Sequence, residues 1–189
     1  MKIRIAILVL LSGACSFALE NEIKMEPATG TVKFEAIGRP KMLFINGTGE
    51  GVSSNLKIFD SKISGEVSFR LASLKTGIEQ RDQEMKEKYL EVKQHPLAKL
   101  VFSQFQMPAG WSIKNPKVVE SSFRGKFSLH GVEREITGLY SIDQSLKKST
   151  AKFDIKLSDF KIQLPEYLGI KVADFVKVSV VIDKLEVVK

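Results

Sequence analysis

The chain has 189 residues and a formal net charge of +7, and its only cysteine is Cys15. This length fits a single domain that is large enough for a substantial core or a lined cavity. The basic charge lacks the clustered arginines and exposed aromatic residues of nucleic-acid-binding proteins, so we expect no nucleic-acid partner. A peripheral contact with anionic lipid headgroups is compatible with this charge.

The N-terminus predicts a targeting segment rather than part of the fold. Lys2 and Arg4 precede an apolar run at 5–11, which is too short to span a bilayer as a stable helix. The sequence Ser-Phe-Ala, which ends at Ala18, has the small-x-small pattern of a signal-peptide cleavage site. We therefore expect a signal peptide over 1–18 and a periplasmic or secreted protein.

Cleavage after Ala18 leaves one domain, 19–189, without cysteine, which excludes disulfides, a cysteine nucleophile and thiolate metal ligands in that domain. Removing Lys2 and Arg4 lowers the 29 basic residues to 27, and 27 − 22 acidic residues gives a formal charge of +5. A lipoprotein is the alternative, because small residues precede Cys15 and lipidation would then fall on that side chain.

Most of the chain alternates apolar and polar residues with the period of two that is typical of half-buried β-strands. The clearest example is 119–130, where Val119, Phe123, Phe127 and Leu129 share one face. The pattern predicts strands over 31–38, 41–47, 56–59, 67–72, 99–106, 119–130, 133–142, 151–158 and 176–182, with 185–188 extending the last of them.

Glycines and prolines predict the connections between these strands. Asn46-Gly47, followed by Gly49 and Gly51, predicts a turn or a bulged corner. The other predicted connections are 61–65, a loop at 107–116 that carries Trp111, a turn at Gly131, and a loop that holds Pro165 and Gly169.

One short amphipathic helix interrupts this β pattern. We predict that Asp82 is its N-cap, because a carboxylate there can accept hydrogen bonds from the first turn. Met85, Tyr89 and Val92 recur at helical spacing and give a narrow apolar stripe. Pro96 cannot continue a helix, so the helix ends before it. The stripe needs a sheet or the mouth of a cavity on which to pack.

About eight antiparallel strands, each with one apolar face, favour a closed arrangement because closure removes sheet edges and gathers the apolar faces inside. We therefore predict an all-β fold, a single antiparallel β-barrel with one helix inserted mid-chain. A β-sandwich shows the same alternation, so the period alone does not separate the two. The interior can be a filled core or a cavity for one ligand, and composition does not choose between them.

The sequence contains no phosphate-binding loop, nucleophile elbow or His-Glu-x-x-His motif, so we expect neither an enzyme nor a cofactor or metal site. His95 precedes a proline, and His130 lies on the polar face of a strand end, where we expect a surface residue. An enzyme that uses Asp82, Glu84 or His130 is a further hypothesis, and it requires these groups to meet in one cleft.

Three stretches together resemble the YceI-like family of exported polyisoprenoid-binding proteins. The first, at 74–102, contains Leu-Lys-Thr-Gly, Arg-Asp, Tyr-Leu-Glu-Val and Leu-Val-Phe. The second, at 125–132, is Gly-Lys-Phe-Ser-Leu-His-Gly-Val, and the third is 153–160 followed by 172–178. The chain departs from the family pattern at Glu84, where many members have histidine.

This resemblance implies a lipocalin-like barrel with an elongated apolar channel. We therefore predict an exported, non-catalytic protein that holds a long apolar isoprenoid or isoprenoid quinone. The side chains that we expect to line the channel are Phe69, Leu71, Phe102, Phe127, Leu129, Phe153, Ile155, Val178 and Val180, with Met85 and Tyr89 at one mouth. The alternative is a structural or interaction protein of the envelope with a filled barrel and no ligand.

Overall fold

The computed structural model describes residues 21–25, 30–39, 43–59, 62–109, 118–143, 148–167, 169–183 and 186–188. The expected signal peptide, with Cys15 and the cleavage site after Ala18, lies outside the described residues, and so does Trp111.

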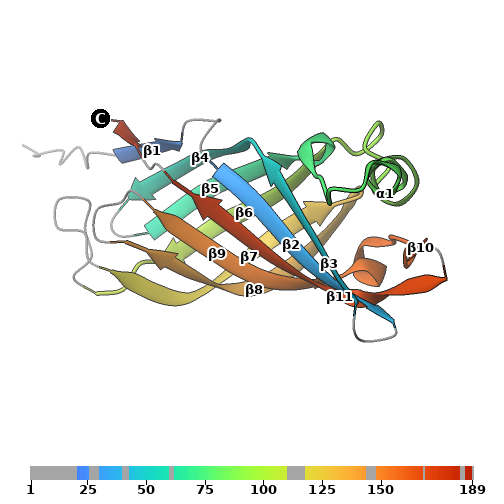
Figure 1. Ribbon diagram of the computed structural model, residues 1–189. Coiled ribbons are helices and arrows are strands. Elements are labelled where there is room, and N and C mark those ends of the chain that lie inside the picture. The colour runs from blue at the N-terminus through green and yellow to red at the C-terminus, as the bar shows by residue number, and fades with distance from the viewer. Residues whose placement is uncertain are drawn as a thin grey trace, which may run out of the picture.

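The described residues form strands with three short helical segments (Figure 1). The strands are β1 (Asn21–Met25), β2 (Gly30–Arg39), β3 (Leu43–Glu50), β4 (Val52–Phe59), β5 (Lys62–Arg70), β6 (Leu97–Gln106), β7 (Val119–Leu129), β8 (Val132–Ile142), β9 (Ser149–Lys156), β10 (Glu166–Tyr167), β11 (Ile170–Ile182) and β12 (Glu186–Val188). The helical segments are η1 (Leu71–Ser73), α1 (Glu79–Glu84) continued by the π-helix η2 (Met85–Tyr89), and η3 (Leu157–Phe160).

The strands belong to one antiparallel sheet that curls round a common interior (Figure 1). Its main path runs β4-β5-β6-β7-β8-β9-β11-β2-β3, while β1 and β12 continue beyond β4 and β10 pairs with β11. The two ends of the main path, β3 and β4, follow each other in the chain and meet at Gly51. The Gly51 N–H donates to the carbonyl oxygen of Gly30 in β2 at 3.1 Å. The predicted all-β, lipocalin-like fold with one mid-chain helix is confirmed.

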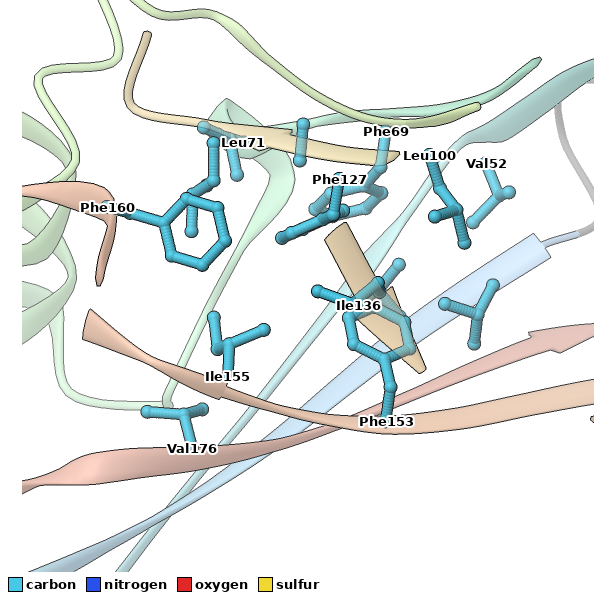
Figure 2. Close-up of a cluster of buried hydrophobic side chains, with 14 of the residues drawn as sticks. Val52, Phe69, Leu71, Leu100, Phe127, Ile136, Phe153, Ile155, Phe160 and Val176 are labelled. Carbon is cyan, nitrogen blue, oxygen red and sulfur yellow. The ribbon is translucent and has the colours of Figure 1, made fainter. Parts of the chain in front are cut away.

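One face of the curled sheet is buried and the other faces solvent, as the alternation predicts. β7 buries Val119, Phe123, Phe127 and Leu129, and it pairs with β8 along its whole length. Figure 2 shows side chains from several strands pointing into this shared interior. Among the described residues, the buried set contains no polar or charged side chain, so burial of apolar area is its main stabilising contribution.

The turn that we predicted at Asn46-Gly47 is wrong, because β3 continues through both Gly47 and Gly49. These glycines do not form a turn; each allows a neighbouring aromatic ring to approach the backbone closely. A Cβ at Gly47 would lie 2.2 Å from the Phe34 ring, and one at Gly49 would lie 2.6 Å from the Phe69 ring. The turn falls at Gly51, the last glycine of the predicted run, where φ is 89°.

Two further expectations about connections are also wrong. The segment 61–65 belongs largely to β5, which contains a bulge at Gly65, where φ is 130° and the pairing with β6 changes register. The segment 185–188 does not extend the last long strand. Its residues 186–188 form β12, which pairs with β1 at the other side of the sheet.

The helix begins four residues earlier than the N-cap prediction placed it. It starts at Glu79, and the N-cap residue is Ile78, which makes no side-chain capping bond. Asp82 lies inside α1, and its carboxylate accepts a hydrogen bond from the Thr76 backbone N–H at 2.7 Å and another from the Thr76 hydroxyl. The side chain therefore fixes the loop before the helix, which sequence spacing alone does not distinguish from a cap.

We predict that Gly49→Ala destabilises the protein by about 1–3 kcal/mol, because the added methyl group meets the Phe69 ring and the Ser73 hydroxyl. In a strand without this contact, the same change would stabilise slightly by restricting the unfolded chain. Urea unfolding of Gly49→Ala, Phe69→Leu and the double variant measures the coupling between the two sites. Additive effects, or a stabilised single variant, would contradict the close-approach explanation.

Candidate functional site

An apolar cavity of about 170 Å³ lies inside one end of the curled sheet, beneath the helical segment α1–η2. Strands β2, β3, β5, β6, β7, β9 and β11 all contribute to its wall, together with η1 and η3. Figure 2 shows Leu71, Phe127, Ile155 and Val176 converging from different elements on this region. The apolar side chains on the wall are Val32, Phe34, Ala36, Ile45, Phe69, Leu71, Leu74, Met85, Tyr89, Leu90, Ala98, Phe127, Leu129, Ile155, Leu157, Ile162, Pro165, Val172, Val176 and Val178.

The helical segment covers the cavity with the apolar stripe that the sequence predicts. Met85 and Tyr89 both line the cavity. The segment changes from α- to π-helical geometry at this point, and the Leu90 N–H donates to the Met85 carbonyl oxygen at 2.9 Å. The Tyr89 hydroxyl donates to the Glu166 carbonyl oxygen at 3.3 Å and accepts from the Glu166 N–H at 3.2 Å. These two bonds tie the cover to β10 across the cavity.

The polar side chains on the wall are Thr76, Arg81 and Glu84, all at the helical cover. Arg81 donates from Nε to the Thr76 hydroxyl oxygen at 2.8 Å and from Nη2 to the Thr76 carbonyl oxygen at 3.1 Å. Lys75, the neighbour of Thr76, exchanges two backbone hydrogen bonds with Thr48 of β3, at 2.7 and 2.8 Å. We call Thr76, Arg81 and Glu84 the polar rim. The hydrogen bonds hold Thr76 and Arg81 in place, while the interior behind the rim is apolar.

Six of the nine side chains that we expected to line the channel are on the cavity wall: Phe69, Leu71, Phe127, Leu129, Ile155 and Val178. The structure places Phe102, Phe153 and Val180 elsewhere in the buried interior, away from this wall. Whether any of these side chains contacts a ligand stays a prediction.

Phe102 and Phe153 belong to an aromatic cluster that fills the other part of the interior. We define this cluster as Phe102, Phe105, Phe123, Tyr140 and Phe153. Its ring centroids form a chain of contacts, with Phe105–Tyr140 at 4.7 Å, Phe102–Phe123 at 5.6 Å and Phe123–Phe153 at 6.2 Å. Burial raises the pKa of Tyr140, which keeps its hydroxyl neutral. The interior is thus a filled core in one part and an open cavity in the other.

Phe127 stands at the boundary between these two parts. Its side chain lines the cavity, and its ring packs edge-on against Phe153 of the aromatic cluster at 5.3 Å and against Phe160 at 5.6 Å. Edge-to-face packing of this kind fixes the orientation of a ring more firmly than apolar burial alone. Phe127 therefore sets how far the cavity extends into the interior.

Sequence reasoning missed the part of the wall that β2 and β3 supply. Val32, Phe34 and Ala36 line the cavity from β2, and Ile45 lines it from β3. The alternation of apolar residues at 32, 34 and 36 carried the signal for β2. Leu157 continues the alternation of Phe153 and Ile155, which carried its signal, whereas Ile162 follows η3, where no period marks an inward direction.

The groups of the enzyme hypothesis bind to different partners. Asp82 accepts hydrogen bonds from Thr76, Glu84 lines the cavity, and His130 contacts Glu91 at 3.0 Å. The expectation that His130 is a surface residue is wrong, because its side chain is only 14% exposed. Its second ring nitrogen lies 3.1 Å from the Phe160 carbonyl oxygen.

The fold and the sequence together define the class of this protein. A family model described as a YceI-like domain matches residues 24–183, and the chain belongs to that family. The resemblance seen in the sequence is therefore confirmed. No match was found among the curated proteins compared with this chain.

Three solved structures share the fold at low sequence identity. A polyisoprenoid-binding domain from Saccharophagus degradans is 14% identical, with a TM-score of 0.59 over 84% of this chain and 95% of that one. BcnA from Burkholderia cenocepacia is 22% identical, with a TM-score of 0.61 over 84% and 96%. The YceI protein of Campylobacter jejuni is 20% identical, with a TM-score of 0.50 over 77% and 85%.

A search of the described residues for membrane-spanning helices found none of sufficient length and apolar character.

We predict that Tyr89→Phe loosens the cover without changing the apolar wall. The substitution leaves the Glu166 N–H without its acceptor, which costs about 1 kcal/mol of local stability. Amide hydrogen exchange should then become about fivefold faster at 85–90 and 166–167. Tyr140→Phe is the control, because the hydroxyl lost there contacts Met107 Sδ, in the other part of the interior. Equal changes at the cover in both variants would contradict the prediction.

Proposed function

We propose that this protein binds a long apolar lipid, an isoprenoid or isoprenoid quinone, in its cavity, without covalent attachment and without catalysis. The observation that carries the proposal is an apolar cavity beneath a helical cover, with its polar side chains gathered at that cover. The description of the Saccharophagus degradans domain as polyisoprenoid-binding supports it, as does membership of the YceI-like family. The signal-peptide pattern at 1–18 supports a periplasmic or secreted location.

Burial of the lipid chain supplies the binding energy. At about 25 cal/mol per Å², removing roughly 400 Å² of chain from water contributes on the order of 10 kcal/mol before the costs of association. The wall offers few polar groups, so a chain of carbon and hydrogen meets no unsatisfied donor there. The polar end of the lipid then lies at the rim, beside Thr76, Arg81 and Glu84.

The cavity volume limits what enters without rearrangement. A volume of about 170 Å³ is close to the roughly 150 Å³ engineered cavity that accepts one benzene molecule. It is smaller than the roughly 300–1,000 Å³ of common ligand pockets. A long chain therefore requires the cover to move outwards, and the flexible Met85 side chain gives the cover an adaptable inner surface.

The alternative function is a structural or interaction role in the envelope, with no ligand. The aromatic cluster favours it, because that part of the interior is already filled by interlocking rings.

We predict that the native protein carries a lipid. The full chain would be expressed in a bacterial host, purified without detergent, and extracted with organic solvent for mass spectrometry. A stoichiometric isoprenoid in the extract is the expected result. An extract that stays empty, even after incubation with isoprenoid alcohols and quinones of several chain lengths, would refute lipid binding and favour the alternative.

We predict that Ala36→Phe reduces lipid binding at least about tenfold, because the ring occupies space that two or more methylene groups would fill, at about 0.8 kcal/mol each. Ala98→Leu fills the same cavity from β6 with a smaller side chain, and it serves as the test if Ala36→Phe does not fold. Ala72→Phe is the matched control, because Ala72 is exposed in η1. If folded wall variants bind lipid as tightly as the control, the ligand lies elsewhere.

A further inference from the structure

Three side chains with metal-binding atoms meet where the end of the helical cover lies beside the β7–β8 turn. Glu91 follows the end of η2, His95 comes just before β6, and His130 lies in the turn between β7 and β8. One ligand atom from each lies within 4.8 Å of the other two. The chain has only two histidines, and both are in this group.

The hydrogen bonds of His130 leave a place for a cation. Its Nδ1 lies 3.1 Å from the Phe160 carbonyl oxygen, which can only accept, so Nδ1 carries the proton. In a neutral imidazole Nε2 is then an acceptor, yet it faces Glu91 Oε2 at 3.0 Å. Two acceptors at this distance repel each other unless a cation, either a second proton or a metal ion, lies between them.

The distance between His130 and Glu91 and the contact that supports His130 suit a transition-metal ion. Nitrogen and oxygen ligands about 2.0–2.1 Å from a tetrahedral zinc ion lie roughly 3.3 Å apart, which is close to the separation of His130 Nε2 and Glu91 Oε2. A backbone carbonyl that holds the other imidazole nitrogen is the usual support for a metal-binding histidine. The Phe160 carbonyl is in this position.

His95 completes the group because the neighbouring turn leaves room for its ring. The His95 and His130 ring centroids are 4.9 Å apart. A Cβ at Gly131 would lie 2.7 Å from His95 Cε1, so only glycine leaves this space open. On the other side, the His95 N–H donates to the Glu91 carbonyl oxygen at 2.9 Å, which places both side chains on one tight turn.

The backbone conformation is unusual at two of the three residues. Glu91 has a φ of 45° and His130 a φ of 52°, and the described residues include one other non-glycine residue with positive φ, Lys161. Glutamate is not among the residue types enriched in this region, so its conformation is held by the surrounding contacts. Such conformations are concentrated at sites where geometry serves binding.

We propose that Glu91, His95 and His130 bind one divalent transition-metal ion of the zinc type, with a fourth position open to water. Two imidazoles and one carboxylate suit zinc and similar ions, whereas Mg²⁺ and Ca²⁺ prefer ligand sets made of oxygen. The ion joins the end of the helical cover to the β7–β8 turn. Through Phe160, whose ring packs on Phe127, it also connects to the boundary of the cavity.

The first test is the binding of Zn²⁺ to untagged, chelator-treated protein, measured by isothermal titration calorimetry. We expect one Zn²⁺ per chain, and a loss of at least about tenfold in affinity for His95→Gln, His130→Gln and Glu91→Gln. Glu135→Gln is the matched control, because it removes the same charge from an exposed ion pair with Arg124 and should bind as the wild type does. Wild-type binding that survives in the His95→Gln/His130→Gln double variant would overturn the proposal.

A second measurement separates ligation from a purely structural role of these residues. With only two imidazoles in the chain, NMR assigns their resonances by comparison with His95→Gln. One equivalent of Zn²⁺ should shift both, and Mg²⁺ should shift neither. Unchanged imidazole resonances at one equivalent of Zn²⁺ would overturn the site.

The lipid and metal proposals are tested independently. Ala36→Phe should lose lipid and keep Zn²⁺ binding, because Ala36 lies on the cavity wall and makes no part of the metal group. Loss of Zn²⁺ binding in folded Ala36→Phe would contradict the assigned ligands.

Discussion

The structure depends on one constraint, which is that a single antiparallel sheet with one apolar face must bury that face against itself. Curling satisfies this constraint along the strands, and the apolar side chains of opposite walls meet inside. Curling alone leaves the end of the sheet beside the cavity to be covered by another element. The helical segment α1–η2 covers that end, so its apolar stripe faces inwards, with Tyr89 bonded to β10 and the preceding loop bonded through Lys75 to β3.

The interior divides at Phe127 into a part that packs and a part that stays open. Interlocking rings stabilise the filled part through contacts between protein side chains alone. The open part is lined by aliphatic and aromatic side chains from many elements, and a short helical cover forms part of its wall. Stability and binding are therefore carried by different regions of one core, which lets the binding part adapt.

The sequence predicted much of the fold and part of the site, for physical reasons. The period of two located the inward faces of β7 and β11, because most of the apolar positions on each face are buried. Gly47 and Gly49 misled the prediction, since a glycine that admits a neighbouring ring looks the same in sequence as one that makes a turn. Asp82 accepts from Thr76 rather than from its own helix, and the contact between Glu91 and His130 joins segments 39 residues apart. Local patterns carry no information about such contacts.

The pairing of β2 with β11 places Val32 of the early chain directly opposite Val180 near its end. A chain that becomes available from its N-terminus can build the meander from β4 to β9 in order, since each strand meets its neighbour as soon as that neighbour is present. β2 and β3 can pair with each other early, but the other edge of β2 must wait for β11. That edge stays unpaired for most of the interval, so pairing of β2 with β11 is the most non-local step of closure and the one that leaves a strand edge open to aggregation.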